Sequence, residues 1–225
     1  MTHMLASSPA AVRPGAAAAT VFVVDDDDSL RRALGRVLRA PGWSVEGFGS
    51  AEAFLDRLPF RGVGCVLLDV NMPGLSGPEL QARLLSEGST LPVVFLTGHG
   101  DIPTGIGAMK RGAVDFLTKP VDDETLLRTV AQAIEAHAQR GAHDRELGEA
   151  QQRLERLSPR EREVMELVVA GLLNKQIADH MEISIKTVKV HRSRVMEKME
   201  VRSVAALVHL CELAGITPPA EAPRR

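Results

Sequence analysis

The chain has 225 residues, which is enough for one large domain or for two domains with separate cores. Its 27 Lys and Arg residues nearly balance 29 Asp and Glu residues, so the overall charge neither indicates nor excludes a nucleic-acid partner. No uncharged apolar run approaches the roughly 18 residues that a membrane span requires. Residues 1–19 lack the basic start and apolar centre of a signal peptide, so we expect a disordered tail and a cytoplasmic protein without a membrane partner.

Charge is distributed unevenly along the chain. Residues 20–123 hold 10 basic and 14 acidic side chains, whereas residues 183–202 hold 6 basic and 2 acidic ones. An acidic half and a locally basic segment indicate two separate roles. The two cysteines, Cys65 and Cys211, lie far apart in apolar runs, and we expect them to be buried free thiols of a reducing compartment.

Five short apolar runs alternate with helical patterns between residues 20 and 137. The runs, which are rich in Val and Leu, are Thr20–Val24, Trp43–Phe48, Val63–Asp69, Pro92–Thr97 and Val114–Leu117. The segments between them repeat apolar residues at helical spacing, as at Leu30, Leu34 and Val37. This alternation predicts an α/β domain: a doubly wound, five-stranded parallel sheet of the flavodoxin-like type, with helices on both faces.

Polar residues follow several of these predicted strands. Asp25–Asp28 follow the first strand, Asp69 ends the third, Thr97 ends the fourth and Lys119 follows the fifth. Because the carboxyl ends of parallel strands meet at one edge of the sheet, we expect these side chains to converge. Neighbouring carboxylates raise each other's pKa unless a cation joins them, and a set of hard oxygen donors suits Mg²⁺. Two of the acids, Asp27 and Asp28, have a simpler interpretation as caps of the helix that follows.

Four segments resemble the receiver domain of response regulators, in particular the FixJ-like branch of the NarL/FixJ family. They are VVDDD (Val23–Asp27), LLDVNMPGLSG (Leu67–Gly77), LTGHGD (Leu96–Asp101) and GAVDFLTKP (Gly112–Pro120). The resemblance implies that Asp69 takes a phosphoryl group from a phosphohistidine on a partner histidine kinase. It also implies that Lys119 and Thr97 hold the phosphoryl oxygens, and that Phe116 is the switch aromatic that follows Thr97 inward.

The same resemblance implies a set of ligands for Mg²⁺. Asp25 and Asp26 would be the acid pair, with Asp26 the direct ligand, while Asp69 and the backbone carbonyl of Asn71 complete the set. The roles of Asp27, Asp28 and His99 stay open. The Lys119–Pro120 bond is cis in similar receivers, which the sequence alone does not decide.

Residues 138–157 differ in character from the segments on either side. They are charged and rich in Gln, with glycines at Gly141 and Gly148 and few apolar residues. We therefore predict a partly helical linker.

Residues 158–216 show helical patterns only, followed by a short tail over residues 217–225. The segment Ser158–Glu161 is a capping box with Pro at the first helical position, and Gly171 can close that helix. We expect Asn174, Ser184 and Ser203 to cap three further helices. The pattern predicts a small all-α bundle of four helices.

The third helix of this bundle has two different faces. Val188, Val195 and Met199 form an apolar stripe with His191 beside it. The opposite, mostly basic face carries Lys186, Lys189, Val190 and Ser193, flanked by Thr187 and Arg194. A face of cations and short side chains is what a helix in the major groove requires. We expect His191 to be a hydrogen-bonded packing residue and the head of Arg192 to reach outward from the packed stripe.

Three segments closely resemble the LuxR-type helix-turn-helix. They are LSPRERE (Leu157–Glu163), NKQIAD (Asn174–Asp179) and ISIKTVKVH (Ile183–His191). The resemblance implies a scaffold helix over residues 174–180 and a recognition helix over residues 184–199. Lys175 would then contact a phosphate of double-stranded DNA, while Lys189 and Val190 read bases.

Together, these features predict a two-component response regulator and not a turnover enzyme. Phosphorylation of Asp69 would reshape residues 102–117, through which two receivers pair and present two recognition helices to DNA, with RNA polymerase as a further partner. A Mg²⁺-dependent phosphohydrolase is one alternative, although Asn71 stands where such enzymes carry a second Asp. A constitutive DNA-binding protein with a purely structural receiver is another.

Overall fold

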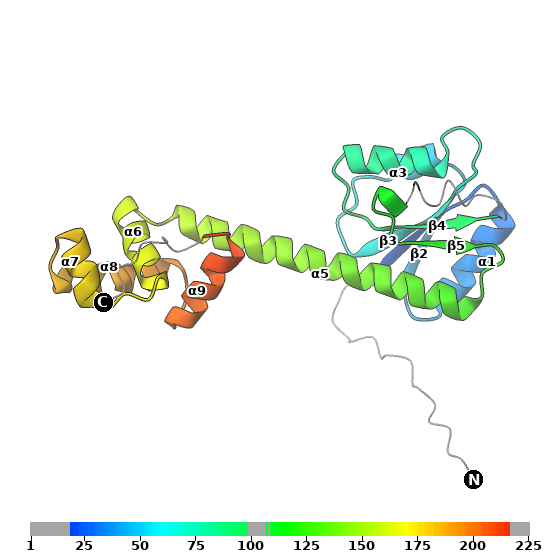
Figure 1. The fold of residues 1–225 in the computed structure, drawn as a ribbon. Helices are drawn as coiled ribbons and strands as arrows, with labels where there is room; N and C mark the ends of the chain where they lie inside the picture. Colours follow the sequence, from blue (N-terminus) through cyan, green and yellow to red (C-terminus); the bar gives the residue numbers. More distant parts are fainter. Residues whose placement is uncertain (1–18, 99–106, 108, 217–225) are drawn as a thin grey trace, which may run out of the picture. The chain divides into compact units, whose positions relative to one another are not determined.

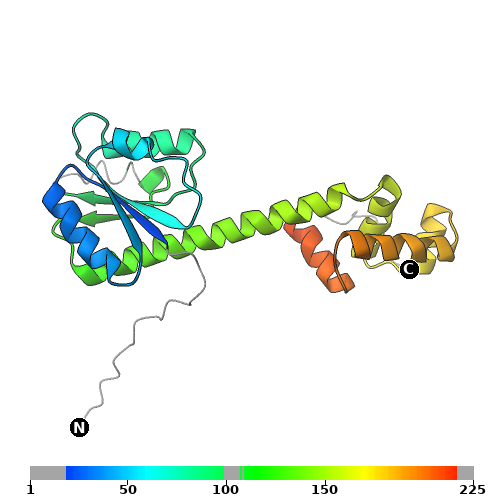
Figure 2. The same cartoon turned by 180° about the vertical axis from the view of Figure 1, so that it is seen from behind.

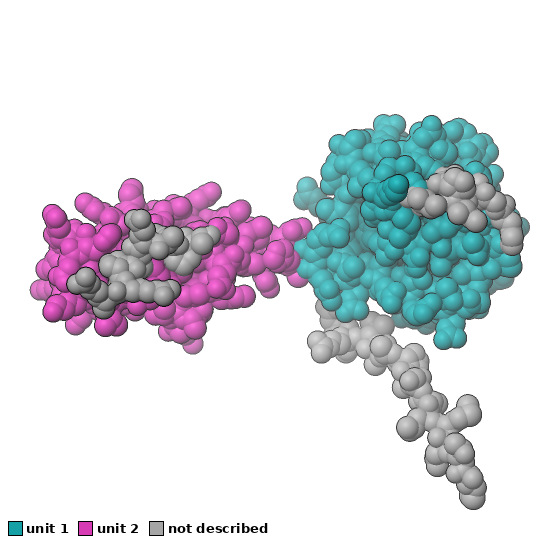
Figure 3. All heavy atoms as spheres, in the orientation of Figure 1, with its two compact units in different colours: residues 1–141 teal, residues 142–225 magenta. Residues whose placement is uncertain are grey.

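The computed structural model describes residues 19–98, 107 and 109–216. The chain divides into two compact units, residues 1–141 and residues 142–225, which Figure 3 shows in teal and magenta. Each unit is described by itself below. His99 and most of the predicted pairing segment up to residue 108 lie outside the described residues.

The first unit is built on a five-stranded parallel sheet. Its strands are β1 (Thr20–Val24), β2 (Ser44–Phe48), β3 (Gly64–Asp69), β4 (Val93–Thr97) and β5 (Asp115–Thr118). They lie in the order β2-β1-β3-β4-β5, and every neighbouring pair is parallel. The predicted fold class is confirmed. The strand order reverses direction at β1 and β3, and ligands of such sheets bind at the carboxyl ends of the strands there.

Helices cover both faces of this sheet. α1 (Asp28–Arg39) and the first part of α5 (Asp123–Glu155) pack on one face, and α2 (Ala51–Leu55) and α3 (Gly77–Ser86) pack on the other (Figures 1 and 2). Successive side chains of a strand point to opposite faces. The side chains of β1 accordingly alternate between the two cores, with Val21 and Val23 in one and Phe22 and Val24 in the other.

Two glycines are fixed by close backbone contacts at opposite ends of β3. A Cβ on Gly64 would lie 2.3 Å from the carbonyl oxygen of Thr20. A Cβ on Gly77, at the start of α3, would lie 2.2 Å from the carbonyl oxygen of Asp69. Both distances are far below van der Waals contact, so only glycine fits at either position.

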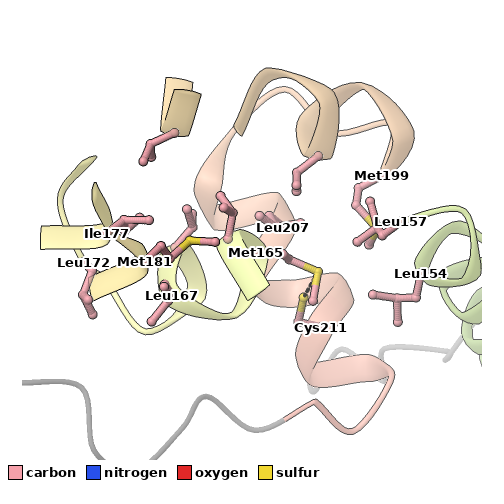
Figure 4. Close-up of a cluster of buried hydrophobic side chains, with 14 of the residues drawn as sticks. Leu154, Leu157, Met165, Leu167, Leu172, Ile177, Met181, Met199, Leu207 and Cys211 are labelled. Atoms are coloured by element: carbon pink, nitrogen blue, oxygen red, sulfur yellow. Dashed lines mark hydrogen bonds between the residues drawn. The ribbon is translucent and has the colours of Figure 1, made fainter. Parts of the chain in front are cut away.

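The second unit is a helical bundle. It contains the last part of α5 together with α6 (Pro159–Val169), α7 (Asn174–Met181), α8 (Ile185–Lys198) and α9 (Val204–Leu213). Figure 4 shows its core, in which Met165, Ile177, Leu207 and Cys211 are fully buried. The Sγ atom of Cys211 lies 3.7 Å from the Sδ atom of Met165. Both cysteines of the chain are buried and free, as predicted.

Most of the predicted helix caps in this unit are confirmed. The side chains of Ser158, Ser184 and Ser203 each accept a hydrogen bond from a backbone N–H in the first turn of their helices. Gly171 has the positive φ of 86° that closes α6. The predicted cap at Asn174 is wrong.

Leu173 takes the cap position of α7 in place of Asn174. The side chain of Gln176 accepts the hydrogen bond of the Leu173 N–H, at 2.8 Å. Asn174 is the first residue of the helix, and its side chain bonds to α8 instead. A tertiary contact has therefore overridden the local preference of Asn for a cap.

The segment that the sequence marks as a partly helical linker lies mostly within α5. That helix runs without a break to Glu155, through both Gly141 and Gly148. Its last turns carry Ala150 and Leu154, which are buried, and Leu154 belongs to the core of the second unit. Within the part of the chain that the structure describes, no helix is long and apolar enough to cross a membrane.

Candidate functional site

An ion triad lies at the carboxyl edge of the sheet, where the sequence predicts a pocket. The Nζ atom of Lys119 lies 2.6 Å from Oδ1 of Asp69 and 2.7 Å from Oδ2 of Asp25. Both carboxylates are almost completely buried, and the lysine side chain is about a quarter exposed. The sheet thus brings together residues from the ends of β1 and β3 with a residue that follows β5.

The surroundings of these groups shift their protonation. Burial raises the pKa of Asp69, the charge of Asp25 adds to that rise, and the bonds of Lys119 offset only part of it. Burial alone would lower the pKa of Lys119, but its bonds to Asp25 and Asp69 outweigh this effect and raise the pKa. The site therefore pairs a permanently charged ammonium with a carboxylate that is more basic than usual.

The acids that follow β1 have different roles. The Asp27 side chain caps α1 by accepting hydrogen bonds from the N–H groups of Ser29 and Leu30. Asp28 forms ion pairs with Arg31, at 3.0 Å, and with Arg32. The Asp27 side chain thus caps the helix, while the Asp26 side chain is exposed.

The remaining residues of the predicted receiver site lie around this triad. The second carboxylate oxygen of Asp69 accepts the backbone N–H of Asn71, at 3.0 Å. Thr97 is buried at the end of β4, with its hydroxyl 3.1 Å from the carbonyl oxygen of Gly98. Phe116 is partly buried on β5, with its ring centroid 6.2 Å from that of Phe95. The Lys119–Pro120 bond is cis.

The donor set at this edge fits a small hard cation. Among the described residues, no three His, Cys, Asp or Glu side chains gather closely enough to hold a metal ion by themselves. Mg²⁺ usually takes only one or two protein carboxylates and keeps several water molecules. Asp25 and Asp69, with the exposed Asp26 beside them, match that smaller requirement.

A small apolar groove opens beside Lys119, and sequence reasoning did not identify it. Its volume is about 170 Å³, and Leu30, Ala33 and Val37 of α1 line it together with Pro120 and Val121. These positions follow the helical spacing of α1, but the sequence does not show that residues 120–121 lie opposite them. The groove is an apolar surface next to the triad.

The predicted DNA-contacting residues of the second unit form one exposed surface on α8. All of the following α8 residues are exposed: Lys186, Thr187, Lys189, Val190, Ser193 and Arg194. Val188 and Val195 on the other side of the helix are buried in the core. Lys175, at the start of α7, is exposed as well. The basic face is thus free while the apolar face packs, as the sequence predicts.

Two side chains of α8 differ from expectation. The Arg192 guanidinium points to α7, where its Nη1 atom donates a hydrogen bond to Oδ1 of Asn174, at 2.9 Å. The prediction that the guanidinium of Arg192 reaches outward is therefore wrong. The Nδ1 atom of His191 is buried and has no hydrogen-bond partner among the described residues. His191 therefore packs without the bond that we expected at this atom. The Arg192–Asn174 bond fixes the beginning of α7 against α8.

A second tertiary contact joins α8 to α6. The Nζ atom of Lys198 lies 2.6 Å from Oε2 of Glu161, whose carboxylate also accepts the N–H of Ser158. These hydrogen bonds lower the pKa of the buried Glu161 to about 2, and the bond from Lys198 has the largest effect. The glutamate of the predicted capping box is therefore also an anchor for the end of α8.

Comparisons with known proteins divide the chain at the same two regions. Residues 21–131 match the model of the response regulator receiver domain, and residues 155–211 match the model of bacterial regulatory proteins of the LuxR family. The chain is 45% identical over 199 residues to nodulation protein W of Bradyrhizobium diazoefficiens, a match that covers 88% of each chain. It is 43% identical to the transcriptional regulatory protein FixJ of the same organism, over 87% of this chain and 96% of that one.

Solved structures agree with these sequence comparisons. The response regulator StyR is 45% identical and matches with a TM-score of 0.79, over 87% of this chain and 99% of that one. Full-length FixJ from B. japonicum is 43% identical and matches with a TM-score of 0.57, over 88% and 98% of the two chains. Both similarities extend over the two units of the structure.

Proposed function

The chain belongs to the two-component response regulators of the NarL/FixJ family, which regulate transcription through a receiver and a LuxR-type DNA-binding domain, and we propose that phosphorylation of Asp69 controls it. The observation that carries this proposal is the bond of Lys119 to both Asp69 and Asp25. We assign the receiver to residues 20–137 and the DNA-binding domain to residues 158–216.

In the proposed transfer, a carboxylate oxygen of Asp69 attacks the phosphorus of a phosphohistidine on the histidine kinase. The new P–O bond forms as the P–N bond breaks, and the released imidazole takes up a proton. The raised pKa of Asp69 favours this attack, because a more basic oxygen is a better nucleophile. Lys119 offsets the negative charge that accumulates when a carboxylate meets a phosphoryl group.

Mg²⁺ would be held by Asp25, Asp26, Asp69 and the backbone carbonyl of Asn71, and when bound it supplies further positive charge to the transfer. The residues of the chain position the phosphoryl group afterwards. After the transfer, Lys119 can donate a hydrogen bond to a phosphoryl oxygen in place of the Asp69 oxygen. The buried hydroxyl of Thr97 is a second donor at the same edge of the sheet, and its inward movement would be followed by the ring of Phe116.

We place the kinase on the apolar groove beside Lys119. A phosphohistidine must reach Asp69 through the open edge of the sheet, and this groove is the apolar surface next to that edge. Its lining includes Ala33, which leaves room for an apolar side chain of a partner.

We propose that two phosphorylated receivers pair through residues 102–117. Two described side chains of this segment support pairing, because Met109 and Val114 are large hydrophobic residues that are 44% and 38% exposed. A symmetric pair would bring two copies of α8 to neighbouring half-sites of double-stranded DNA.

Within each copy, the DNA contacts are assigned to the exposed face of α8. Lys186 and Arg194 reach phosphates, Lys189 and Val190 face base edges, and Thr187 and Ser193 are short enough to allow close approach. Lys175 contacts a phosphate from the start of α7. Transcription is then regulated through RNA polymerase.

Phosphorylation by acetyl phosphate and Mg²⁺, measured by intact mass, tests the central claim. The wild type should gain one phosphoryl group, Asp69→Asn should gain none, and Lys119→Ala should react more slowly. The wild type should also become dimeric and bind a duplex selected from a random pool more tightly, whereas Asp69→Asn should not change.

Two outcomes would contradict the proposal. A phosphoryl group on Asp69→Asn at the wild-type rate would place the acceptor elsewhere. A wild type that takes up no phosphoryl group, yet binds the selected duplex, would favour a constitutive DNA-binding protein with a structural receiver.

A further inference from the structure

A groove between α1 and the edge strand β2 has no role in the phosphoryl chemistry proposed above. Its volume is about 430 Å³. Four arginines of α1 line it, namely Arg31, Arg32, Arg36 and Arg39. We call this feature the arginine groove. It is separate from the apolar groove beside Lys119, which lies along different residues of the same helix.

Two glycines keep the arginine groove open. Gly35 of α1 and Gly47 of β2 both line it. A Cβ on Gly35 would lie 3.0 Å from Nη1 of Arg39, and a Cβ on Gly47 would lie 3.7 Å from Cδ of Arg31. A larger side chain at either position would fill the space beside a guanidinium group.

The arginine groove carries excess positive charge. Asp28 is the one acid among the described residues that line it, and it is shared between Arg31 and Arg32. Within the described part of the chain, Arg39 donates only to the backbone oxygens of Gly35 and Val45. Arg36 has no hydrogen-bond or ion-pair partner among the described residues. Three of four positive charges are thus not neutralised within the groove, in a receiver that is acidic as a whole.

The spacing of these charges selects a compact anion. Arg32 and Arg39 are seven residues apart on one helix, which corresponds to about 10 Å at the helical rise of 1.5 Å per residue. In an extended acidic peptide, side chains on one face are about 7 Å apart, so only about two carboxylates would meet the groove. A polyphosphate places more charge within the same length, and its tetrahedral groups fit the fork of a guanidinium.

We propose that the arginine groove binds a polyphosphate through its phosphate groups. Among the described residues, no aromatic side chain lines the groove on which a nucleotide base could stack. Inorganic tripolyphosphate and a nucleoside triphosphate should therefore bind alike, because both present the same chain of phosphates.

The arginine groove is connected to the ion triad through Arg31. The Nη1 atom of Arg31 donates to the backbone oxygen of Asp25, at 2.6 Å, while its Nη2 atom pairs with Asp28. A polyphosphate that competes with Asp28 for Arg31 would act on the segment that holds Asp25. An effect of binding on phosphorylation rests on the proposed role of Asp69, whereas binding itself does not.

Titration of the full chain with tripolyphosphate, followed by calorimetry and by amide NMR without Mg²⁺, tests the inference. The amide signals of Gly35 and Gly47 should shift on binding, which separates this site from the basic face of α8. The double variant Arg32→Glu with Arg36→Glu should weaken binding by at least about tenfold, because it replaces two charge-assisted contacts by repulsion. The matched control is Arg61→Glu, at an exposed arginine outside the groove, which should bind as the wild type does.

Three results would overturn the inference. These are the absence of saturable binding, binding that the double variant leaves unchanged, and tighter binding of an octaglutamate peptide than of tripolyphosphate at the same arginines. ATP that binds much more tightly than tripolyphosphate would contradict recognition through phosphates alone. Asp69→Asn should bind tripolyphosphate as the wild type does, so failure of this site and failure of the proposed function can be told apart.

Discussion

The ammonium of Lys198, at the end of α8, lies 2.6 Å from the carboxylate of Glu161, in the first turn of α6. Glu161 is buried, and it also accepts the N–H of Ser158, so one carboxylate both caps α6 and holds the end of α8. The position of the end of α8 on the core therefore depends on a charged pair as well as on apolar packing.

Glu161→Gln should destabilise the second unit at pH 7. Gln can still accept a hydrogen bond but loses the charge, and a hydrogen bond to a charged group contributes about 1.5–3 kcal/mol. We expect a loss of that order in the free energy of unfolding, measured by urea titration with amide NMR signals of α6 and α8. Lys198→Met should cost more, because it leaves a buried carboxylate without its cation.

The effect of Glu161→Gln should depend on pH in a defined direction. The hydrogen bond of Lys198, with that of the Ser158 N–H, lowers the Glu161 pKa from its ordinary 4.5 to about 2 in the folded chain. A lowered pKa adds stability above pH 4.5 that disappears as the pH falls towards 2. The difference between wild type and variant should shrink over this interval, and a constant difference would show that the pair has no such role.

Asp69→Asn should stabilise the first unit at pH 7. Burial raises the Asp69 pKa. A carboxyl group with a raised pKa stabilises the fold fully below its ordinary pKa of 3.8, and this stabilisation is lost as the pH rises through the raised pKa. The neutral amide removes this cost, so the free energy of unfolding should rise. The fluorescence of Trp43, the one tryptophan of the chain, reports this unit in a urea titration. Asp56→Asn, at an exposed site, should leave the midpoint unchanged.

Ala33→Arg should block the kinase without affecting the chemistry of Asp69. A large charged side chain would fill the apolar groove beside Lys119. A panel of histidine kinases would first identify the one that phosphorylates the wild type fastest. We expect the rate of transfer from this kinase to fall by at least about tenfold in the variant, which corresponds to the loss of about 1.4 kcal/mol of binding free energy. Phosphorylation by acetyl phosphate should not change. Ala131→Arg, at an exposed position of α5 outside the groove, is the control, and equal loss in both variants would argue against docking there.

Lys175→Ala and Val190→Ala should weaken DNA binding in different ways. Loss of a phosphate contact lowers affinity for all sequences and reduces the dependence of log K on log salt by about 1. Val190 is 44% exposed on α8, and its loss should instead change the preferred base at one position of the selected duplex. Binding measured at several salt concentrations checks the first effect, and repeated selection checks the second. An unchanged salt dependence in Lys175→Ala would remove this residue from the interface.

The convergence of the receiver residues was predictable because it follows from topology. Once the alternation of strands and helices implied a parallel sheet, the ends of β1, β3 and β5 had to share one edge, and Lys119 had to lie near Asp69. The sequence could not show that Lys119 binds Asp25 as well. That contact depends on side-chain conformations within the pocket, which no residue pattern specifies.

The second unit shows where local preferences lose to tertiary contacts. Asn commonly caps helices, but the side chain of Asn174 bonds to Arg192 eighteen residues away. Gly141 and Gly148 are among the reasons for predicting a linker that is only partly helical, yet α5 continues through both. A glycine within a helix costs only about 1 kcal/mol relative to alanine, which packing at the two ends of α5 can offset. The apolar groove beside Lys119 lies between α1 and residues 120–121, which are distant in sequence, so no motif identifies it.

Gly77 has no side chain to take part in chemistry, yet its backbone sits where any Cβ would collide with the carbonyl oxygen of Asp69. In a library that substitutes every position and measures only transcriptional output in cells, substitutions of this glycine should therefore be as damaging as substitutions of Asp69. The two losses would look alike in such a screen although one removes a reactive oxygen and the other displaces it. A soluble-yield measurement made in parallel would distinguish them, since we expect Asp69→Asn to keep its fold.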